Sequence, residues 1–440
     1  MTPVALSILF FVQLAAILAV CRVVGLIFRK LGQSQVVSEM IAGVLLGPSL
    51  LGWMSPRLVT LLTPLLGPMF PDGQFPNISA LLFPAASKPI IYAVSQLGLV
   101  LYMFLIGAEL DLSLISKRVR AAVLVSASGI AAPFALGVCL SLFISGDHAL
   151  WGESVTPVMA GLFMGAAMSI TAFPMLARII YEQGLTKTSI GVLALTAGAV
   201  DDAAAWVVLA FMVAAFDGNP GGAVVALGGT VLYGVGTLLG VPRLLRPLAR
   251  RVEQEGKMPD GVFSVVLCLL MLGAWFTDVI HIYAVFGAFV MGIAMPRGLF
   301  QKELERKIMP LTTNLLLPLF FIYSGLNTQI GLVNSPYLWF LTGLVLVAAV
   351  GGKFFACAGA ARITGESWRD SLTIGALMNA RGLMELILLN IALERGIIRP
   401  PLFAVLVLMA VVTTLMASPL FKAIRSKAVT ASPRFQEGVI

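Results

Sequence analysis

Apolar segments long enough to cross a lipid bilayer recur along the whole of this chain. A spanning helix needs roughly 20 predominantly apolar residues, and segments of about that length, separated by short polar connections, account for most of the 440 residues. Only 11% of the residues are charged, 59% are hydrophobic and the mean hydropathy is +0.98. No soluble domain tolerates such a composition, so the sequence predicts an all-α, polytopic integral membrane protein.

Thirteen apolar segments can be distinguished, and basic residues set their orientation. The eighth and ninth segments nearly merge close to residue 280, so twelve spans is the alternative count. Lys and Arg gather in the loops after odd-numbered segments, and such loops face the cytoplasm. We therefore expect the N-terminus outside and the C-terminus in the cytoplasm, in the plasma membrane (the inner membrane of a bacterium). The approximate segment cores are 4–27, 36–52, 90–110, 121–144, 157–180, 190–216, 222–245, 261–280, 282–296, 309–331, 337–361, 371–393 and 402–421.

The seventh segment and the polar loop after it divide the other segments into six and six. The two sixes then have opposite orientations, which is the inverted-repeat plan of secondary transporters. The net charge of +8 belongs to the loops of this topology, so we expect the lipid bilayer and no nucleic acid as a partner. The expected organisation is one transport domain over 1–440, with a first inverted repeat at 1–216, a linker helix and cytoplasmic loop at 217–260, a second inverted repeat at 261–421 and a short cytoplasmic tail at 422–440.

Two adjacent carboxylates, Asp201 and Asp202, lie in the middle of the sixth segment. Charged side chains at such a depth cost a few kcal/mol each and normally mark an ion path. Neighbouring residues project about 100° apart on a helix, so one acid can face a water-filled cavity while the other faces a partner in the bundle. Lys353, in the middle of the eleventh segment, also needs a carboxylate partner, and either aspartate can supply it. The alternative is that both acids only form structural pairs.

Polar, breakable patches occupy corresponding positions in the two halves. The fifth segment contains SITAFP (169–174) and the twelfth contains NARGLME (379–385). Interrupted helices at matching positions of two repeats indicate a transport site. The side-chain oxygens of Ser169 and Thr171 are candidate cation ligands, and the backbone carbonyls freed by the break could serve as well.

Arg381 and Glu385 lie four residues apart in the second patch, hence on one face of a helix. We interpret them, together with Asn379, as a structural or gating group, because an always-charged arginine repels a cation. Glu39, at the start of the second segment, could lie at a cytoplasmic mouth.

These residues resemble the second branch of the monovalent cation:proton antiporter superfamily, and within it the CHX-like cation/H⁺ exchangers of plants and fungi. The resemblance implies a homodimer in which a scaffold domain supports a mobile core domain with two crossed, broken helices. It implies Asp202 as the essential carboxylate for cation and proton, with Asp201 and Lys353 beside it. Many CHX-like exchangers have Asn-Asp where this chain has the Asp201–Asp202 doublet. The matching stretches are GVLLGPSLLG (43–52), LYMFLIGAELD (101–111), SITAFPMLARI (169–179), VDDAAAWVVLA (200–210), VFGAFVMGIAMPRG (285–298), LPLFFIYSGL (317–326), GGKFFA (351–356) and LMNARGLMELILLNIA (377–392).

The leading hypothesis is a secondary antiporter, and not an enzyme, that exchanges Na⁺ or K⁺ for H⁺ by alternating access in cation and pH homeostasis. No cofactor is expected besides the transported ions, and no glycine-rich stretch has the strand–turn–helix setting of a nucleotide loop. One alternative is a sodium-coupled symporter of an organic anion, which would need a roomy pocket with hydrogen-bond donors. The other is a cation-gated channel or sensor, which would need rings of carbonyls or charges along an open path.

Overall fold

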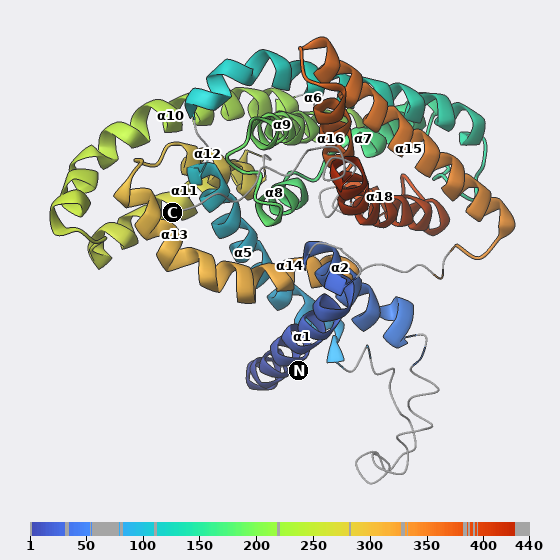
Figure 1. Cartoon of the computed structure of the whole chain (residues 1–440). Helices are drawn as coiled ribbons and strands as arrows, with labels where there is room; N and C mark the ends of the chain where they lie inside the picture. The colour runs from blue at the N-terminus through green and yellow to red at the C-terminus, as the bar shows by residue number, and fades with distance from the viewer. Residues whose placement is uncertain are drawn as a thin grey trace, which may run out of the picture.

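The computed structural model describes residues 2–30, 35–52, 54, 79, 82–109, 112–217, 221–280, 283–326, 331, 333–381, 385, 388–389, 392–393 and 395–426. These residues are almost entirely helical (Figure 1). The helices are α1 (Pro3–Lys30), α2 (Gln35–Leu46), α5 (Lys88–Glu109), α6 (Leu112–Ile144), α7 (Pro157–Ser169), α8 (Phe173–Glu182), α9 (Ser189–Asp217), α10 (Gly221–Glu255), α11 (Asp260–Val279), α12 (Ala284–Ile293), α13 (Leu299–Leu311), α14 (Leu317–Leu326), α15 (Pro336–Ile363), α16 (Trp368–Met378) and α18 (Pro400–Ser426).

The predicted all-helical membrane fold is confirmed at this level. Seven stretches within the described residues are long and apolar enough to span a membrane, by length and composition. The remaining predicted segments also fall on helices, but these are shorter, interrupted, more polar or only partly described. The eighth and ninth predicted segments form two separate helices, α11 and α12. They fold back on each other, because Gly287 of α12 lies against the Thr277 side chain and the Gly273 carbonyl of α11.

Local sequence explains where several helices begin. Thr156, Ser335 and Ser367 each precede a helix, and each side-chain oxygen accepts a hydrogen bond from a backbone N–H in the first turn, at 3.1–3.3 Å. Pro157 and Pro336 follow the first two caps, and proline suits the first helical position because the N–H that it lacks would have no partner there. These short signals fix the starts of α7, α15 and α16.

The helices pack into two bundles (Figure 1). We call α6–α9, α15, α16 and α18 the core bundle, and α1, α2, α5 and α11–α14 the scaffold bundle. Most strong helix–helix contacts fall inside one bundle or the other. The long helix α10 follows α9 and packs on the scaffold, while the contacts that join the bundles directly run mainly from α8 to α2 and α5 and from α9 to α12.

The scaffold bundle contains a very close helix pair, α5 and α12. A Cβ atom on Gly107 of α5 would collide with the Phe289 carbonyl, and one on Gly292 of α12 would collide with the Phe104 carbonyl. Glycines at a helix interface let backbones approach closely, and membrane helices rely on such packing because lipid provides no hydrophobic drive for association. The two glycines therefore set the distance between these helices.

A backbone bridge joins the two halves of the core bundle at one end. The loop before α7 and the segment before α18 pair through Trp151 and Ile398. The Gly152 N–H donates to the Ile397 carbonyl at 3.1 Å and the Arg399 N–H donates to the Leu150 carbonyl at 2.9 Å. This bridge lies at the end of the core bundle opposite to the C-terminus of α8.

Candidate functional site

The fifth predicted segment is interrupted, as its sequence indicates. Helix α7 ends at Ser169, Ile170 is extended with φ −63° and ψ 136°, and α8 begins at Phe173. Two β-branched residues at the break disfavour helix slightly, and Pro174 cannot donate the hydrogen bond that would continue it. The chain from Pro157 to Glu182 is therefore two half-helices with an extended link.

The second interruption meets the first in the middle of the core bundle. Helix α16 ends at Met378, and the Ala172 N–H donates to the Ala380 carbonyl at 3.0 Å. Thr414 of α18 holds the same stretch, since its hydroxyl donates to the Arg381 carbonyl and accepts from the Arg381 N–H. The two predicted breaks thus touch directly through their backbones. Gly382–Met384 of the predicted patch lie outside the described residues.

Asp201 is buried inside the core bundle against the first break. The Lys353 ammonium lies 3.3 Å from Asp201 Oδ2, and the Thr171 hydroxyl donates to the same oxygen at 2.6 Å. Lys353 also donates to the Ser169 carbonyl. Lys353 and Asp201 are 0% and 1% exposed, so the predicted need of Lys353 for a carboxylate is met by Asp201.

Arg381 has a larger role in the geometry than its sequence spacing indicates. Its guanidinium donates to the carbonyls of Ala167 and Met168 at the C-terminus of α7. The expected pair with Glu385 is present but looser, at 3.8 Å. A helix C-terminus carries partial negative charge and unpaired carbonyls, so the arginine of the second half caps the half-helix of the first.

The four carbonyls at the C-terminal end of α7 all accept hydrogen bonds in this structure. Arg381 and Lys353 occupy three of them, and the Ser169 hydroxyl donates to the fourth, that of Ala166, at 3.0 Å. Ser169 therefore directs its proton to its own helix. Asn379 likewise turns back, donating to the Gly375 carbonyl at 3.2 Å.

Asp202 lies next to Asp201 on α9, and neighbouring residues of a helix project about 100° apart. Asp202 is fully buried and close enough to Tyr283, at the start of α12, to influence it electrostatically. The Tyr283 hydroxyl donates to the side chain of Gln96 on α5. Helix α9, which carries the doublet, contacts α12 of the scaffold bundle, whereas Asp201 is held within the core bundle by Lys353 and Thr171.

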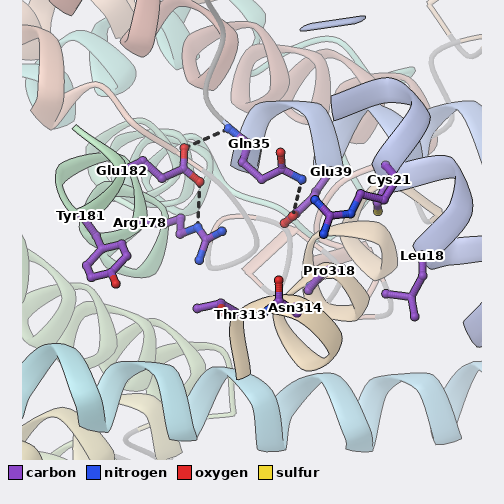
Figure 2. Close-up of a pocket in the computed structure, with 11 residues that line it drawn as sticks. Leu18, Cys21, Gln35, Glu39, Arg178, Tyr181, Glu182, Thr313, Asn314 and Pro318 are labelled. Atoms are coloured by element: carbon purple, nitrogen blue, oxygen red, sulfur yellow. Dashed lines mark hydrogen bonds and ion pairs between the residues drawn. The ribbon is translucent and has the colours of Figure 1, made fainter. Parts of the chain in front are cut away.

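A cavity between the bundles contains Glu39, which the sequence indicated at a cytoplasmic mouth, together with Arg178 and Glu182, which the sequence reasoning did not single out (Figure 2). Its volume is about 470 Å³, and α1, α2, α8 and the start of α14 line it. Arg178 and Glu182 of α8 form an ion pair of 2.8 Å at its wall, and Glu39 of α2 is 1% exposed there. The spacing of Arg178 and Glu182, four residues apart at the end of an apolar segment, was the available signal.

Crossed, interrupted helices around buried ionisable groups define a class of secondary transporters that bind their substrate at the break. The sequence matches the family described as "Sodium/hydrogen exchanger, transmembrane" over residues 15–425. The chain belongs to this family, whose members are membrane transporters rather than enzymes, and it is an integral multi-pass membrane protein.

Several characterised proteins are similar to the chain over most of its length. The Na(+)/H(+) antiporter NhaS4 of Synechocystis is 38% identical over 94% of this chain and 96% of its own length. Cation/H(+) antiporter 20 of Arabidopsis thaliana is 37% identical over 94% of this chain. K(+)/H(+) antiporter 1 of Saccharomyces cerevisiae is 30% identical over the same share. The chain spans about half the length of the plant and yeast proteins, at 48% and 47%.

The fold is also that of a solved transporter. The sodium proton antiporter MjNhaP1 from Methanocaldococcus jannaschii superposes with a TM-score of 0.55, covering 95% of this chain and 97% of its own. At 14% sequence identity, this likeness concerns the fold alone.

Proposed function

We propose that this protein is a secondary antiporter that exchanges Na⁺ or K⁺ for H⁺, with Asp202 as the carboxylate that both ions use. The observation that carries the proposal is a buried doublet beside the two breaks, in which Lys353 pairs with Asp201 while Asp202 is 0% exposed on α9, a helix that also contacts α12 of the scaffold bundle. Membership of the sodium/hydrogen exchanger family and similarity to proteins named Na(+)/H(+) and K(+)/H(+) antiporters support it.

Exchange follows from competition for one carboxylate. A desolvated carboxylate is stabilised by a proton or by a metal cation, and one ion excludes the other. An unloaded Asp202 would carry its charge past the apolar scaffold at a high cost, so the loaded forms cross and the empty form does not.

The core bundle is the candidate moving part. Its two interruptions are bound to each other by Arg381 and the Ala172–Ala380 hydrogen bond, and Lys353 of α15 binds the first of them. Its strongest direct contacts with the scaffold involve few helix pairs. Movement of this bundle against the scaffold would carry Asp202 from one side of the membrane to the other, as in transporters with a fixed midplane site.

The finer organisation is part of the same proposal. We infer thirteen spans in two inverted repeats at 1–216 and 261–421, a linker at 217–260 and a cytoplasmic tail at 422–440, with the N-terminus outside. A homodimer is expected from the resemblance to CHX-like exchangers. Each break falls in the fifth segment of its half, and the two breaks meet inside the core bundle; both observations support the repeats.

The symporter alternative is disfavoured because the two buried cationic side chains, Lys353 and Arg381, already have partners. An organic anion would need free hydrogen-bond donors next to the ion site. Lys353 and Arg381 are instead committed to Asp201, Glu385 and the carbonyls of α7.

The test is the cation dependence of proton release from purified protein in liposomes. Na⁺, K⁺, Li⁺ and Rb⁺ are added in turn to vesicles with an imposed pH gradient, and the internal pH is followed with a dye. At least one of these cations should dissipate the gradient in proportion to protein content. Proton flux that no monovalent cation affects, or flux of a cation without protons, would contradict antiport.

A further inference from the structure

Glu182 connects the two bundles at the wall of the cavity. One of its oxygens accepts the Arg178 Nε proton at 2.8 Å, and the other accepts the backbone N–H of Gln35, the first residue of α2, at 2.9 Å. Figure 2 shows Glu182 between Arg178 and Gln35, with Glu39 below Gln35. The Gln35 side chain in turn donates to Glu39 at 3.0 Å.

The arrangement places a carboxylate of the core bundle on a helix N-terminus of the scaffold bundle. The first N–H groups of a helix have no partner inside it, and they attract negative charge. Arg178 fixes the orientation of Glu182 and lies over the ring of Tyr102 on α5. A single carboxylate thereby caps α2 while it remains bound to its own helix.

The apolar contacts between the bundles, among the residues that the structure describes, are less directional. Phe173 and Phe289, for example, meet edge to face with their ring centroids 4.7 Å apart. Apolar surfaces can slide past each other without an unpaired polar group, whereas a hydrogen bond near 2.9 Å is lost once its atoms separate by more than a few tenths of an ångström. Movement of α8 along α2 must therefore break the Glu182 bond.

We propose that Glu182 is a gating residue that latches the core bundle to the scaffold by capping α2, and that this latch opens and closes in every transport cycle. The proposal rests on the antiport function proposed above, with the core bundle as the moving part. The cavity that the latch borders lies on the side of the basic loops, hence the cytoplasmic side in the expected topology. Glu182 acts through position and does not bind the transported ion.

The charge of the cavity lining is more typical of a gate than of a cation-binding site. Its charged lining consists of Arg22 and Arg178 against Glu39 and Glu182, so the formal charges cancel. A cation that enters this cavity meets no formal excess of negative charge that would retain it.

The decisive experiment joins α2 and α8 covalently. Gln35→Cys and Glu182→Cys are introduced together after the four native cysteines are replaced by serine, and the pair is bridged in proteoliposomes with a short bis-methanethiosulfonate reagent. We expect cross-linking to stop cation/proton exchange and reduction to restore it. A matched control is the pair Arg118→Cys and Glu366→Cys, which replaces an ion pair lying wholly within the core bundle and should leave exchange unchanged when bridged.

The outcomes separate the latch from the antiport function. Exchange that continues with α2 and α8 fully cross-linked would overturn the latch, as would equal inhibition by the control bridge. Absence of exchange from the reduced variant and from the wild type alike would instead contradict the proposed function.

A milder substitution tests the role of the charge. Glu182→Gln keeps the size of the side chain but replaces a charged hydrogen bond by a weaker neutral one. If breaking this bond limits the cycle, turnover per folded molecule should rise roughly threefold to tenfold, with the apparent cation affinity unchanged. Glu255→Gln is the control. Glu255 forms the same kind of i,i+4 ion pair, with Arg251, but both residues lie on α10, so this pair does not connect the two bundles. Unchanged turnover with less folded protein would mark Glu182 as merely structural and overturn the proposal.

Discussion

Asp201 and Asp202 are adjacent in the chain, yet their surroundings differ as much as those of distant residues. Asp201 has a lysine and a threonine hydroxyl on one oxygen, while Asp202 is fully buried on the same helix with neither of these two groups bonded to it. The rotation of about 100° between helix neighbours is enough to give two adjacent carboxylates different surroundings.

Asp202→Asn should abolish cation-dependent proton flux, because the neutral amide can hold neither ion in exchange for the other. The protein should still fold, since the change removes a buried charge and keeps the shape. Flux in proteoliposomes and elution in size-exclusion chromatography are the two measurements, with Glu255→Gln as a control at an exposed carboxylate. Flux near the wild-type level in Asp202→Asn would refute the assignment.

The Asp201–Lys353 pair predicts electrogenic exchange. An arriving cation attracts Asp201 and weakens the pair, so Lys353 can release a proton in apolar surroundings, in addition to the proton displaced from Asp202. Wild-type exchange should therefore respond to a potential imposed with valinomycin, and Asp201→Asn should remove that response.

Lys353→Ala addresses the stability of the same pair. The substitution should lower the transport rate. It should also lower the free energy of unfolding by about 3–5 kcal/mol, because it leaves a buried charge without its partner; thermal unfolding in detergent measures this loss of stability. A wild-type rate that is independent of potential would show that the pair is structural only.

Thr171 and Ser169 are expected to affect apparent cation affinity more than maximal rate. The Thr171 hydroxyl orients Asp201 at 2.6 Å, so Thr171→Val should raise the half-saturating cation concentration severalfold, and Ser169→Ala should do so less. Thr342→Val is a matched control, because that buried threonine donates only to its own helix. Measuring proton flux as a function of cation concentration separates a change in apparent affinity from a change in maximal rate. A fall in maximal rate with unchanged affinity would mean that these hydroxyls hold the break in shape.

Among single residues, the sequence predicted best those contacts in which one buried charge requires an opposite charge. A lysine buried in lipid requires an acid, so Lys353 and the doublet could be paired without a structure. The capping of α7 by Arg381 could not be found this way, because 214 positions separate the guanidinium from the Ala167 carbonyl. The spacing of four residues indicated Glu385 instead, which is the looser partner.

At the scale of elements, the polar patch that ends in Pro174 was sufficient to place a break within 169–174, and the apolar runs were sufficient to place the helices. Which helices touch depends on side chains that complement each other across the bundle. The Gly107–Phe289 and Gly292–Phe104 contacts involve residues common in any membrane helix, so the α5–α12 pair had no distinctive signal.

The close α5–α12 contact gives a prediction about stability. Gly107→Val should push α12 away, because its Cβ would overlap the Phe289 backbone, and should lower the melting temperature of the purified protein by several degrees. Gly351→Val is the control, since no other part of the described chain lies within 4 Å of a Cβ at Gly351 of α15. Equal melting temperatures for the two variants would show that the scaffold adjusts without cost.

For the whole molecule, the odd–even arrangement of basic loops predicts the side on which each loop lies. A cysteine at position 250, in the basic end of α10, should react with a membrane-impermeant maleimide only from the cytoplasmic side. Labelling of Arg250→Cys in intact cells and in inverted vesicles measures this, in a protein whose native cysteines are serine. Reaction from the outside alone would reverse the orientation, and with it the side assigned to the cavity.

The meeting of the two interruptions has a genetic consequence. The Ala172 N–H is bound by Ala380, and α7 is capped by Arg381, so neither half of the chain completes the centre by itself. Lesions at 167–172 that impair transport without unfolding the protein should be suppressed by second changes around 379–381 or at Thr414, which holds that stretch from α18. Selection for restored growth under cation stress should return suppressors that lie more than 200 positions from the original mutation, not beside it.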